Sequence, residues 1–413
     1  MIGSRTIVVA GAGLGGLTTA LALAERGFRS VVVEQTERVE AIGAGIQLSP
    51  NATRILIGLG LGERLRATAV VPSGIRVLHG ASGDEIVRIP LEDAEERYGA
   101  PYWVIHRGDL VGALLAAARE NPEINLELGA RVETFASHTN GVTVKALRKQ
   151  SAVDAQGSAF IGADGMWSVV RRGLGDALPP RFVKRVAWRA MVPADMAPPQ
   201  MRAAEVTLWL GRKSHIVHYP VQSGQTINVV AIAADDWNEP GWSTEAKPAD
   251  VMARFPSGRW SRHVRDLLGI PERWMKWALA ERPIPKRWGD EQTTLLGDAA
   301  HPTLPFLAQG AALAIEDAAV LARRLADNPE TPAAGLRLYE ADRRARAAQV
   351  QKAARKNGNV YQYSGPDAVV RNIVMRMLGG ARLRSRYDWI YSWRPDTNVP
   401  TERDAGATAK TAG

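Results

Sequence analysis

The 413-residue chain carries 52 Lys and Arg against 43 Asp and Glu, a formal net charge of +9, and contains no cysteine. Its length predicts more than one lobe, and 46% hydrophobic with 23% charged residues is typical of a soluble globular protein. The lack of cysteine excludes disulfides, thiolate nucleophiles, cysteine-ligated zinc and iron–sulfur clusters. No apolar run reaches the roughly 20 residues of a membrane span, and no signal peptide fits before the first strand. We therefore expect a cytoplasmic enzyme with no metal and no membrane association.

The N-terminal segment has the pattern of a βαβ unit. Apolar, β-branched residues at 6–10 and 31–34 predict two buried parallel strands, and the stretch between them predicts a helix over 14–26. Gly27 follows this helix, where a left-handed residue commonly ends one. A glycine-rich loop at 11–16 joins the first strand to the helix, as in dinucleotide-binding folds.

Each glycine of this loop has a mechanical task. Gly11 permits the tight turn, Gly13 lets the backbone approach a pyrophosphate, and Gly16 lets the helix pack on the strand. Glu34 ends the second strand, where it is placed to accept hydrogen bonds from an adenosine ribose. We expect a dinucleotide to be held here by Gly11, Gly13, Leu14, Gly15, Gly16, Glu34 and Gln35.

A second segment, far along the chain, predicts the other end of the same ligand. A strand over Thr293–Leu296 runs into Gly297-Asp298, and Asp298 can accept hydrogen bonds from ribityl or ribose hydroxyls. Pro305 stiffens the turn that follows, and Gly310-Ala311-Ala312 opens a helix whose free N–H groups suit the N1–C2=O edge of a flavin. A dinucleotide gripped by two distant segments is more typical of bound FAD than of an exchanging NAD.

Four further polar residues are candidates for roles beside this ligand. Arg107 stands at a strand–helix junction with Asp109 as the predicted N-cap, and it either contacts the phosphate or adenosine end of the dinucleotide or forms a surface salt bridge. Asp164 belongs to an Asp-Gly turn, and we expect it mainly to cap the next helix beside the dinucleotide. For His301 we prefer a structural hydrogen bond to a catalytic role.

Strand patterns also predict a second, largely antiparallel sheet. A hairpin is predicted from Gly74–His79 and Glu85–Ile89, and further strands at Val186–Val192, Glu205–Leu210, His215–Tyr219 and Thr226–Ile232. The predicted fold is α/β: a Rossmann-like FAD-binding domain with an inserted, mainly antiparallel β-sheet substrate domain and a C-terminal helical segment. The expected boundaries are 1–70, 101–180 and 285–330 for the FAD-binding domain and 71–100 and 181–284 for the substrate domain. The C-terminal helical segment is expected at 331–400 and a flexible tail at 401–413. Helices are predicted at 310–326, at the end of the FAD-binding domain, and at 332–357 and 366–378 in the C-terminal segment.

The C-terminal part of the chain is basic. Residues 331–413 hold 15 Lys and Arg against 7 Asp and Glu. Six cations crowd one predicted helix: Arg343, Arg344, Arg346, Lys352, Arg355 and Lys356. A nucleic-acid stripe is one interpretation, but interleaved aromatic residues for base stacking are lacking, so a solvated helix face is favoured and no nucleic acid is expected. The positive field also gathers small anionic substrates.

Together these segments resemble the single-component FAD-dependent aromatic hydroxylases, the para-hydroxybenzoate hydroxylase class. The resemblance covers nearly the whole chain and is carried by Ala44–Asn51, Tyr98–Trp103, His106–Leu110, the Asp-Gly stretch at 162–168 and Gly297–Asp317. Within the class the chain is most similar to 3-hydroxybenzoate 6-hydroxylases, salicylate 1-hydroxylases and 6-hydroxynicotinate 3-monooxygenases. The resemblance implies bound FAD, NADH or NADPH as a transient reductant without a Rossmann domain of its own, O₂ activated as a C4a-hydroperoxyflavin, a small aromatic substrate, and a monomer or homodimer.

An electrophilic hydroperoxide needs an electron-rich ring, so a base must deprotonate the ring hydroxyl of the substrate. His215 and His218 lie on opposite faces of one predicted strand, whereas His215 and Tyr219 share a face. The resemblance implies that His215 is the base and that Tyr219 positions the substrate; the alternative is an ordinary half-buried histidine. Trp188 and Arg189 on the neighbouring strand are expected to line the pocket or pair with a carboxylate.

Departures from the relatives limit the substrate. The hydroxynicotinate enzymes have histidines where Gln47 and Phe306 stand here, and 3-hydroxybenzoate 6-hydroxylases have glutamine where Pro305 stands. The apolar 305–307 wall favours salicylate or another hydroxybenzoate, with Gln47 touching both cofactor and substrate. Two alternatives remain: a flavin-dependent hydroxylase or epoxidase of a larger hydrophobic or secondary-metabolite substrate, and a nucleic-acid-binding protein, which leaves the two FAD-type segments unexplained.

Overall fold

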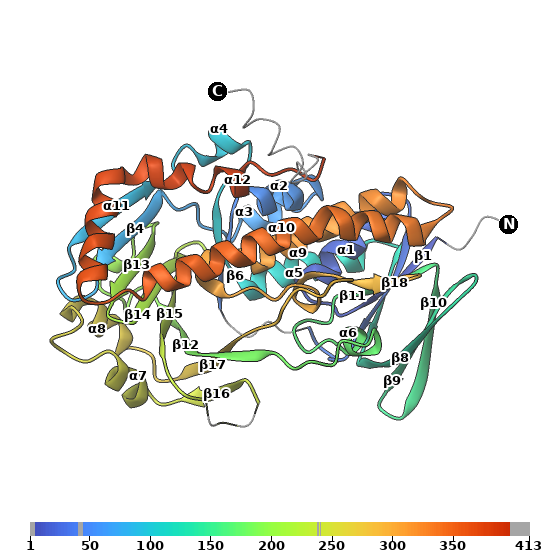
Figure 1. The fold of residues 1–413 in the computed structure, drawn as a ribbon, viewed down its shortest axis with the longest axis horizontal. Coiled ribbons are helices and arrows are strands. Elements are labelled where there is room, and N and C mark those ends of the chain that lie inside the picture. The colour runs from blue at the N-terminus through green and yellow to red at the C-terminus, as the bar shows by residue number, and fades with distance from the viewer. Residues whose placement is uncertain (1–4, 40–43, 238, 240, 397–413) are drawn as a thin grey trace.

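The structure, a computed structural model, describes residues 5–39, 44–237, 239 and 241–396, so the predicted tail at 401–413 lies outside it. The described chain has an α/β fold with two lobes (Figure 1). One lobe is built on a six-stranded, mainly parallel sheet, and the other on an eight-stranded, mainly antiparallel sheet. The long helix α10 (Pro332–Tyr361) runs across both lobes (Figure 1).

The first sheet contains the strands that the βαβ pattern predicted. Its neighbouring strands pair in parallel, except at the β18–β19 edge, which is antiparallel. Strand β1 is buried along nearly its whole length, as expected for a parallel strand covered on both faces. In spatial order the strands are β18 (Gly289–Asp290), β19 (Thr293–Leu295), β11 (Ala159–Gly162), β1 (Thr6–Ala10), β2 (Arg29–Glu34) and β7 (Ile124–Leu128).

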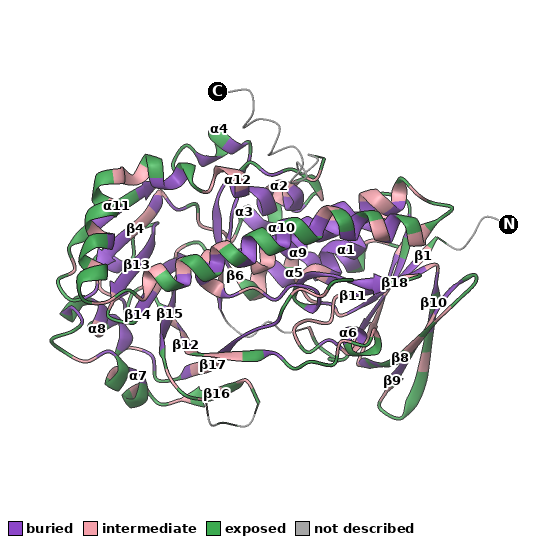
Figure 2. Cartoon of the chain, in the orientation of Figure 1, coloured by how far each residue is buried: buried purple, intermediate pink, exposed green. Residues whose placement is uncertain are grey.

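Helices cover this sheet and bury its apolar side chains. Helix α1 (Leu14–Ala24) packs against α9 (Gly310–Ala326) and α5 (Arg107–Glu120), and its inner residues belong to the largest apolar core (Figure 2). Gly27 adopts φ +76°, which confirms the left-handed residue predicted after the helix. The lobe also contains the short helices α2 (Pro50–Gly58), α3 (Gly62–Arg66), α4 (Ala94–Tyr98) and α6 (Val169–Gly173).

Two small antiparallel sheets complete this lobe. Strands β3 (Gly45–Leu48) and β6 (Trp103–His106) pair with each other, and β3 contacts α2. The second sheet was not predicted, and it projects at the lower right in Figure 1. It contains β8 (Ala130–His138), β9 (Gly141–Arg148) and β10 (Ser151–Gly157).

The eight-stranded sheet confirms the predicted hairpin and the four predicted strands. All neighbouring strands pair in antiparallel fashion except β13 and β4, which run in parallel. Two strands at one edge, β16 and β17, were not predicted. In spatial order the strands are β16 (Ser243–Ala246), β17 (Trp274–Glu281), β12 (Arg181–Pro193), β15 (Thr226–Ala234), β14 (Ser214–Val221), β13 (Val206–Gly211), β4 (Gly74–His79) and β5 (Glu85–Pro90). Helices α7 (Pro248–Arg254) and α8 (Arg262–Leu268) and the 3₁₀ turn η1 (Pro199–Met201) belong to the same lobe.

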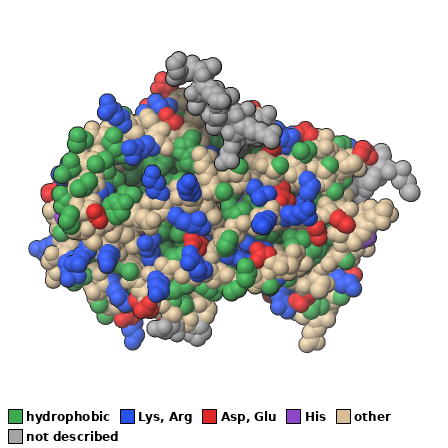
Figure 3. Space-filling model, in the orientation of Figure 1, with side chains coloured by type: hydrophobic (Ala, Val, Ile, Leu, Met, Phe, Trp, Pro, Cys, Tyr) green, Lys and Arg blue, Asp and Glu red, His purple; other side chains and the backbone are tan. Residues whose placement is uncertain are grey.

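The C-terminal helices correct one prediction. We predicted that the basic residues of α10 form a solvated face. Arg343 and Arg346 are instead only 1% and 3% exposed, and both form buried ion pairs with Glu316. Helix α11 (Pro366–Ser385) contains a break at Gly379 and is followed by α12 (Asp388–Tyr391). The outer face of α11 is apolar and exposed, and Figure 3 shows these side chains gathered at the upper left. No described helix is long and apolar enough to cross a membrane.

Candidate active site

A cavity of about 1150 Å³ brings the two predicted dinucleotide segments together. Gly13, Leu14 and Gly15 from the first segment line it together with Asp298, Pro305, Gly310 and Ala311 from the second. A methyl group built on Gly15 would lie 2.7 Å from the Leu296 side chain, so the two segments are in direct contact. The volume exceeds the roughly 300–1,000 Å³ of common ligand pockets, which leaves room for a cofactor and a substrate.

The glycine loop has the shape that its sequence predicts. Gly11 has φ +99°, and a Cβ on it would lie 2.6 Å from the carbonyl oxygen of Ala163. A Cβ on Gly16 would lie only 1.8 Å from the carbonyl oxygen of Gly11, whereas a Cβ on Gly13 would meet nothing within 4 Å. Gly11 and Gly16 are therefore required for internal packing, and Gly13 leaves open space at the start of α1, where a pyrophosphate fits.

Backbone N–H groups are available to an anionic ligand at two helix ends. No side chain caps α1, which begins after Gly13, or α9, which begins after Gln309. Glu34 accepts a hydrogen bond from the Ala12 N–H at 2.8 Å and another from the Thr36 N–H, so it holds the glycine loop in shape. Two open helix N-termini at one cavity suit the pyrophosphate and the ring edge of FAD.

The second segment is held from behind by a buried carboxylate. Asp317 accepts hydrogen bonds from the Gly297 N–H at 3.0 Å and from the His301 ring at 2.6 Å. His301 is 1% exposed and packs against Trp288, with 5.1 Å between the ring centroids. The surroundings of His301 are those of a structural residue. Its hydrogen bond to Asp317 helps to hold the turn that presents Asp298 to the cavity.

A buried amide network joins the turn after β3 to the turn before α9. Gln309 donates to the Ser49 hydroxyl at 2.8 Å, and Asn51 donates to the Gln309 side chain at 3.1 Å. Asn51 also donates to Glu316 on α9 at 2.6 Å. The network therefore sets the start of α9 against the end of β3, the strand that carries Gln47 into the cavity.

Some predicted residues lie behind the cavity and not on its wall. Asp164 accepts hydrogen bonds from the Val169 and Val170 N–H groups at 2.7 and 3.1 Å, which matches the expected supporting role. Asp109 lies in the first turn of α5 and is not its N-cap, because the helix begins at Arg107, itself a lining residue. The predicted cofactor residues absent from the lining are Gly11, Gly16, Glu34, Gln35, Asp164 and Ala312.

The prediction for Trp188 is wrong. Side chains alternate along β12, so Arg189 faces the cavity and Trp188 faces the opposite side. Trp188 is 1% exposed and packs edge-on against Phe255, with 6.2 Å between the centroids, in the core of the second lobe.

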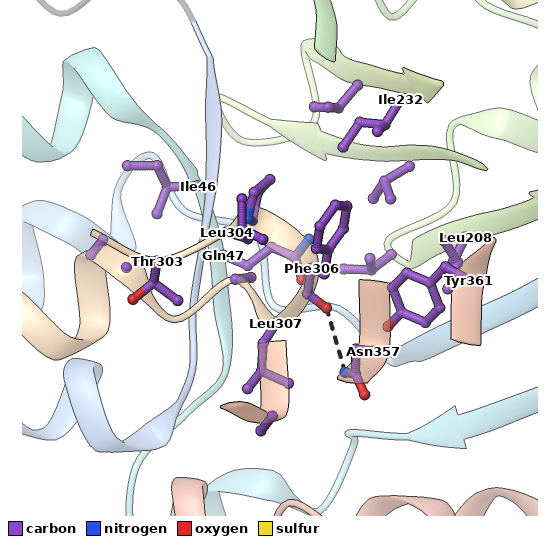
Figure 4. A pocket seen from close by; sticks show the side chains of 18 of the residues that line it. Ile46, Gln47, Leu208, Ile232, Thr303, Leu304, Phe306, Leu307, Asn357 and Tyr361 are labelled. Carbon is purple, nitrogen blue, oxygen red and sulfur yellow. Dashed lines mark hydrogen bonds between the residues drawn. The ribbon is translucent and has the colours of Figure 1, made fainter. Parts of the chain in front are cut away.

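Strand β14 places His215 and Tyr219 on the cavity wall and His218 on the other face, against Trp209. The His215 ring lies between Phe306 and Tyr361, with centroids 5.7 and 5.3 Å away. Burial, with the nearby Arg185, lowers the pKa of His215 to about 3, so its imidazole is neutral at physiological pH. Figure 4 shows the apolar surroundings, with Phe306, Ile232 and Tyr361 around this part of the cavity and Asn357 donating to the Phe306 carbonyl.

A polar group of side chains stands beside this apolar wall. The Tyr102 hydroxyl donates to Gln47 at 2.8 Å, and Gln47, Tyr219 and Arg189 all line the cavity. Burial raises the pKa of Tyr219 and Tyr102, so both hydroxyls remain neutral donors. Burial also lowers the pKa of Arg189, and its Nε has no hydrogen-bond partner among the described residues.

Sequence reasoning missed several lining residues. Tyr102 lies inside a stretch that carried the family resemblance, but nothing local marked it as a site residue. Asn357 and Tyr361 reach the cavity from α10, and Tyr387 from the turn between α11 and α12. Their position depends on how α10 and α11 pack on the second lobe, which no local pattern contains.

Comparisons with known proteins agree with this geometry. Residues 4–354 match the FAD binding domain family. The chain is 36% identical over 390 residues to a 3-hydroxybenzoate 6-hydroxylase of Polaromonas naphthalenivorans, covering 94% of this chain and 96% of that one. It is 39% identical over 373 residues to a 3-amino-4-hydroxybenzoate 2-monooxygenase of Streptomyces cremeus, covering 90% and 91%.

Solved structures show the same fold. Klebsiella pneumoniae HpxO, crystallised with FAD and uric acid, aligns with a TM-score of 0.83 at 24% identity over 95% of this chain and 98% of that one. A salicylate hydroxylase substrate complex aligns with a TM-score of 0.78 at 24% identity over 99% and 98%. With the glycine loop, the Asp298 turn and the shared cavity in place, the chain belongs to the FAD-binding family of single-component, FAD-dependent aromatic-ring hydroxylases.

Proposed function

We propose that this enzyme uses NADH or NADPH and O₂ to add one oxygen atom to a small benzoate that carries a ring hydroxyl. The observation that carries the proposal is the wall where Arg189, His215 and Tyr219 line one cavity. The guanidinium of Arg189 meets no carboxylate among the described residues, and a partly buried cation without an anion is favourable only when a ligand supplies one. The names of the two relatives above support a hydroxylated benzoate as the substrate class.

The residues present fit FAD as the resident cofactor. Gly13 and Leu14 would hold the pyrophosphate at the start of α1, Asp298 the ribityl chain, and the Gly310 and Ala311 N–H groups the ring edge. Bound FAD supplies two-electron redox chemistry and the activation of O₂. Arg107, at the start of α5 and exposed, adds a positive charge at the phosphate end.

The protein's own contribution is to orient the substrate and accept its proton. Arg189 binds the carboxylate, Tyr219 and Gln47 fix the ring substituents, and neutral His215 takes the proton of the ring hydroxyl. A phenolate beside the imidazole then stabilises its protonated form, because the two opposite charges are formed together in a site with little water. Loss of the proton enriches the ring in electrons, as electrophilic oxygen transfer requires.

Replacing His215 by asparagine is expected to lower the rate of product formation by about 10²-fold, the lower end of the range for removing a general base. The substitution preserves polarity while removing the proton acceptor, so FAD content is expected to stay near the wild-type value. Product formation by chromatography and NADH consumption are measured together. The matched control is His218→Asn, which changes the neighbouring histidine on the opposite face of β14. Wild-type rates in His215→Asn would exclude His215 as the base.

A substrate panel tests the function itself. Hydroxybenzoates, aminohydroxybenzoates, hydroxypyridine carboxylic acids and the matching phenols without a carboxylate are compared by substrate-stimulated NAD(P)H oxidation and product mass. The proposal expects stimulation and a product 16 mass units (about one oxygen atom) heavier from a hydroxylated benzoate, and little from its carboxylate-free partner, because Arg189 then lacks its anion. No stimulation by any aromatic acid would refute it.

A second candidate function is the hydroxylation or epoxidation of a larger hydrophobic molecule. The cavity extends beyond His215 to an apolar part lined by Val374, Met375 and Leu378 of α11. Apolar side chains of this kind suit a substrate that carries a hydrophobic substituent. Alkyl-substituted hydroxybenzoates in the same panel distinguish the two functions, since the second predicts the higher kcat/KM for the larger members.

A further inference from the structure

A pair of tryptophans stands next to the cavity and takes no part in the proposed function. The Trp167 and Trp242 rings have centroids 4.8 Å apart with their planes at 42°. Trp167 is 44% exposed, although a side chain of this size is usually well buried. The two rings come from different lobes, because Trp167 follows the turn after β11 and Trp242 directly precedes β16.

Both tryptophans are attached to the cavity wall. Met166, the residue before Trp167, lines the cavity. The carbonyl of Trp242 accepts a hydrogen bond from the Ala278 N–H at 3.0 Å, and Trp277 and Ala278 also line the cavity. The pair thus lies where the turn beside the glycine loop meets β17. It is partly open to solvent and adjacent to the FAD end of the site.

One exposed arginine and one buried, ion-paired arginine contact the backbone of the Trp167 turn. Arg172 is exposed and donates one hydrogen bond to the Trp167 carbonyl at 2.6 Å, which leaves other N–H groups for a ligand. Arg282 donates to the Met166 carbonyl at 3.2 Å and pairs with Asp176. An exposed aromatic face beside a guanidinium is suited to a flat heterocycle that carries a phosphate.

We propose that Trp167 and Trp242 form the docking site for a heterocyclic ring of the reducing nicotinamide dinucleotide, with Arg172 taking one of its phosphates. This inference rests on the proposed function, which requires NADH or NADPH but names no residues that bind it. The aromatic substrate already has Arg189 and His215 as partners on the cavity wall, and neither Trp167 nor Trp242 lines the cavity. Bound FAD would accept a hydride, one proton with two electrons, from the dihydronicotinamide, and the oxidised dinucleotide would then leave this site.

Alanine at either tryptophan is expected to weaken dinucleotide binding by about tenfold, since stacking on one aromatic side chain contributes roughly 1–3 kcal/mol and 1.4 kcal/mol is tenfold. The dissociation constant of tetrahydro-NADH, a reductant analogue that cannot give up a hydride, is measured by titration of the holoenzyme. The KM for NADH is expected to rise in parallel. FAD content and the dissociation constant of the aromatic substrate are expected to stay at wild-type values.

Three variants make the test specific. Trp167→Phe and Trp242→Phe keep an aromatic face and are expected to recover most of the affinity. Leu178→Ala removes another exposed apolar side chain, 71% exposed, and is expected to leave the affinity unchanged. If wild-type enzyme oxidises neither NADH nor NADPH, the proposed function fails. If it oxidises one of them and both alanine variants bind the analogue within twofold of wild type, only the docking site is wrong. A rise in the dissociation constant of the aromatic substrate alone would likewise overturn it.

Discussion

Gly16→Ala is expected to yield a protein that neither retains FAD nor reaches the wild-type unfolding temperature. The new methyl group would lie 1.8 Å from the carbonyl oxygen of Gly11 and 3.4 Å from a Val9 methyl group. Both neighbours belong to the buried strand–loop–helix unit, so α1 must move away from β1, and overpacking of this kind costs about 3 kcal/mol or more. Thermal unfolding followed by circular dichroism, with flavin absorbance of the purified protein, measures both effects.

Two other glycines serve as matched controls. Gly13→Ala meets no atom within 4 Å and has φ −78°, so the protein is expected to fold normally but to bind FAD more weakly, because the methyl group enters the open space at the start of α1. Gly112→Ala lies in α5 with open space around it and is expected to gain about 0.5–1 kcal/mol. A Gly16→Ala protein with wild-type stability and FAD content would show that the packing of α1 on β1 tolerates a side chain.

The parts of the fold that sequence predicted are those with strong local patterns. The β1–α1–β2 unit, the β4–β5 hairpin and helix α9 appear at the expected residues, because apolar periodicity and glycine positions are properties of short segments. Strand β17 was missed, and its burial does not alternate, since its middle residues are all half-buried. In the β8–β10 sheet, which was missed, the outer strands β8 and β10 are largely polar and exposed, so no strong local pattern marks them.

The site residues that sequence predicted are likewise those with a strong local signal. The glycine loop and Asp298 were predicted because each residue type has one mechanical reason for its position. Which of Trp188 and Arg189 faces the cavity was not predicted, because alternation fixes that they differ but not which one points inward. The basic residues of α10 were wrongly predicted to be solvated, for a related reason. The carboxylates that pair with Arg343 lie on another helix, so local composition contains no sign of them.

Arg343→Met is expected to destabilise the protein by about 3–5 kcal/mol, the usual cost of leaving a buried charge without its partner. Arg343 bonds Glu316 and Asp317 at 2.7 Å each, and all three side chains are at most 1% exposed. Methionine has a similar shape, so the lost charge and not a cavity accounts for the effect. Chemical denaturation gives the free energy of unfolding, and Arg344→Met, an exposed neighbour on α10, is expected to change it by less than about 0.5 kcal/mol.

The pH dependence of this variant separates an electrostatic cause from a packing cause. Burial alone would raise the pKa of Asp317, but His301 and Arg343 outweigh it and lower the pKa to about 2. The wild-type contribution of Asp317 is therefore complete above the unfolded pKa, roughly 4, and is lost only as the pH falls toward 2. Arg343→Met removes one of the two groups that lower this pKa, so the folded pKa of Asp317 shifts upward, and the variant should lose less stability at about pH 4 than at about pH 7. A variant whose loss is the same at both pH values would point to packing. Asp317 also accepts a hydrogen bond from the Gly297 N–H behind the cavity. Arg343 keeps Asp317 charged, so the same ion pair that stabilises the packing of α9 and α10 also fixes the turn that forms part of the FAD site.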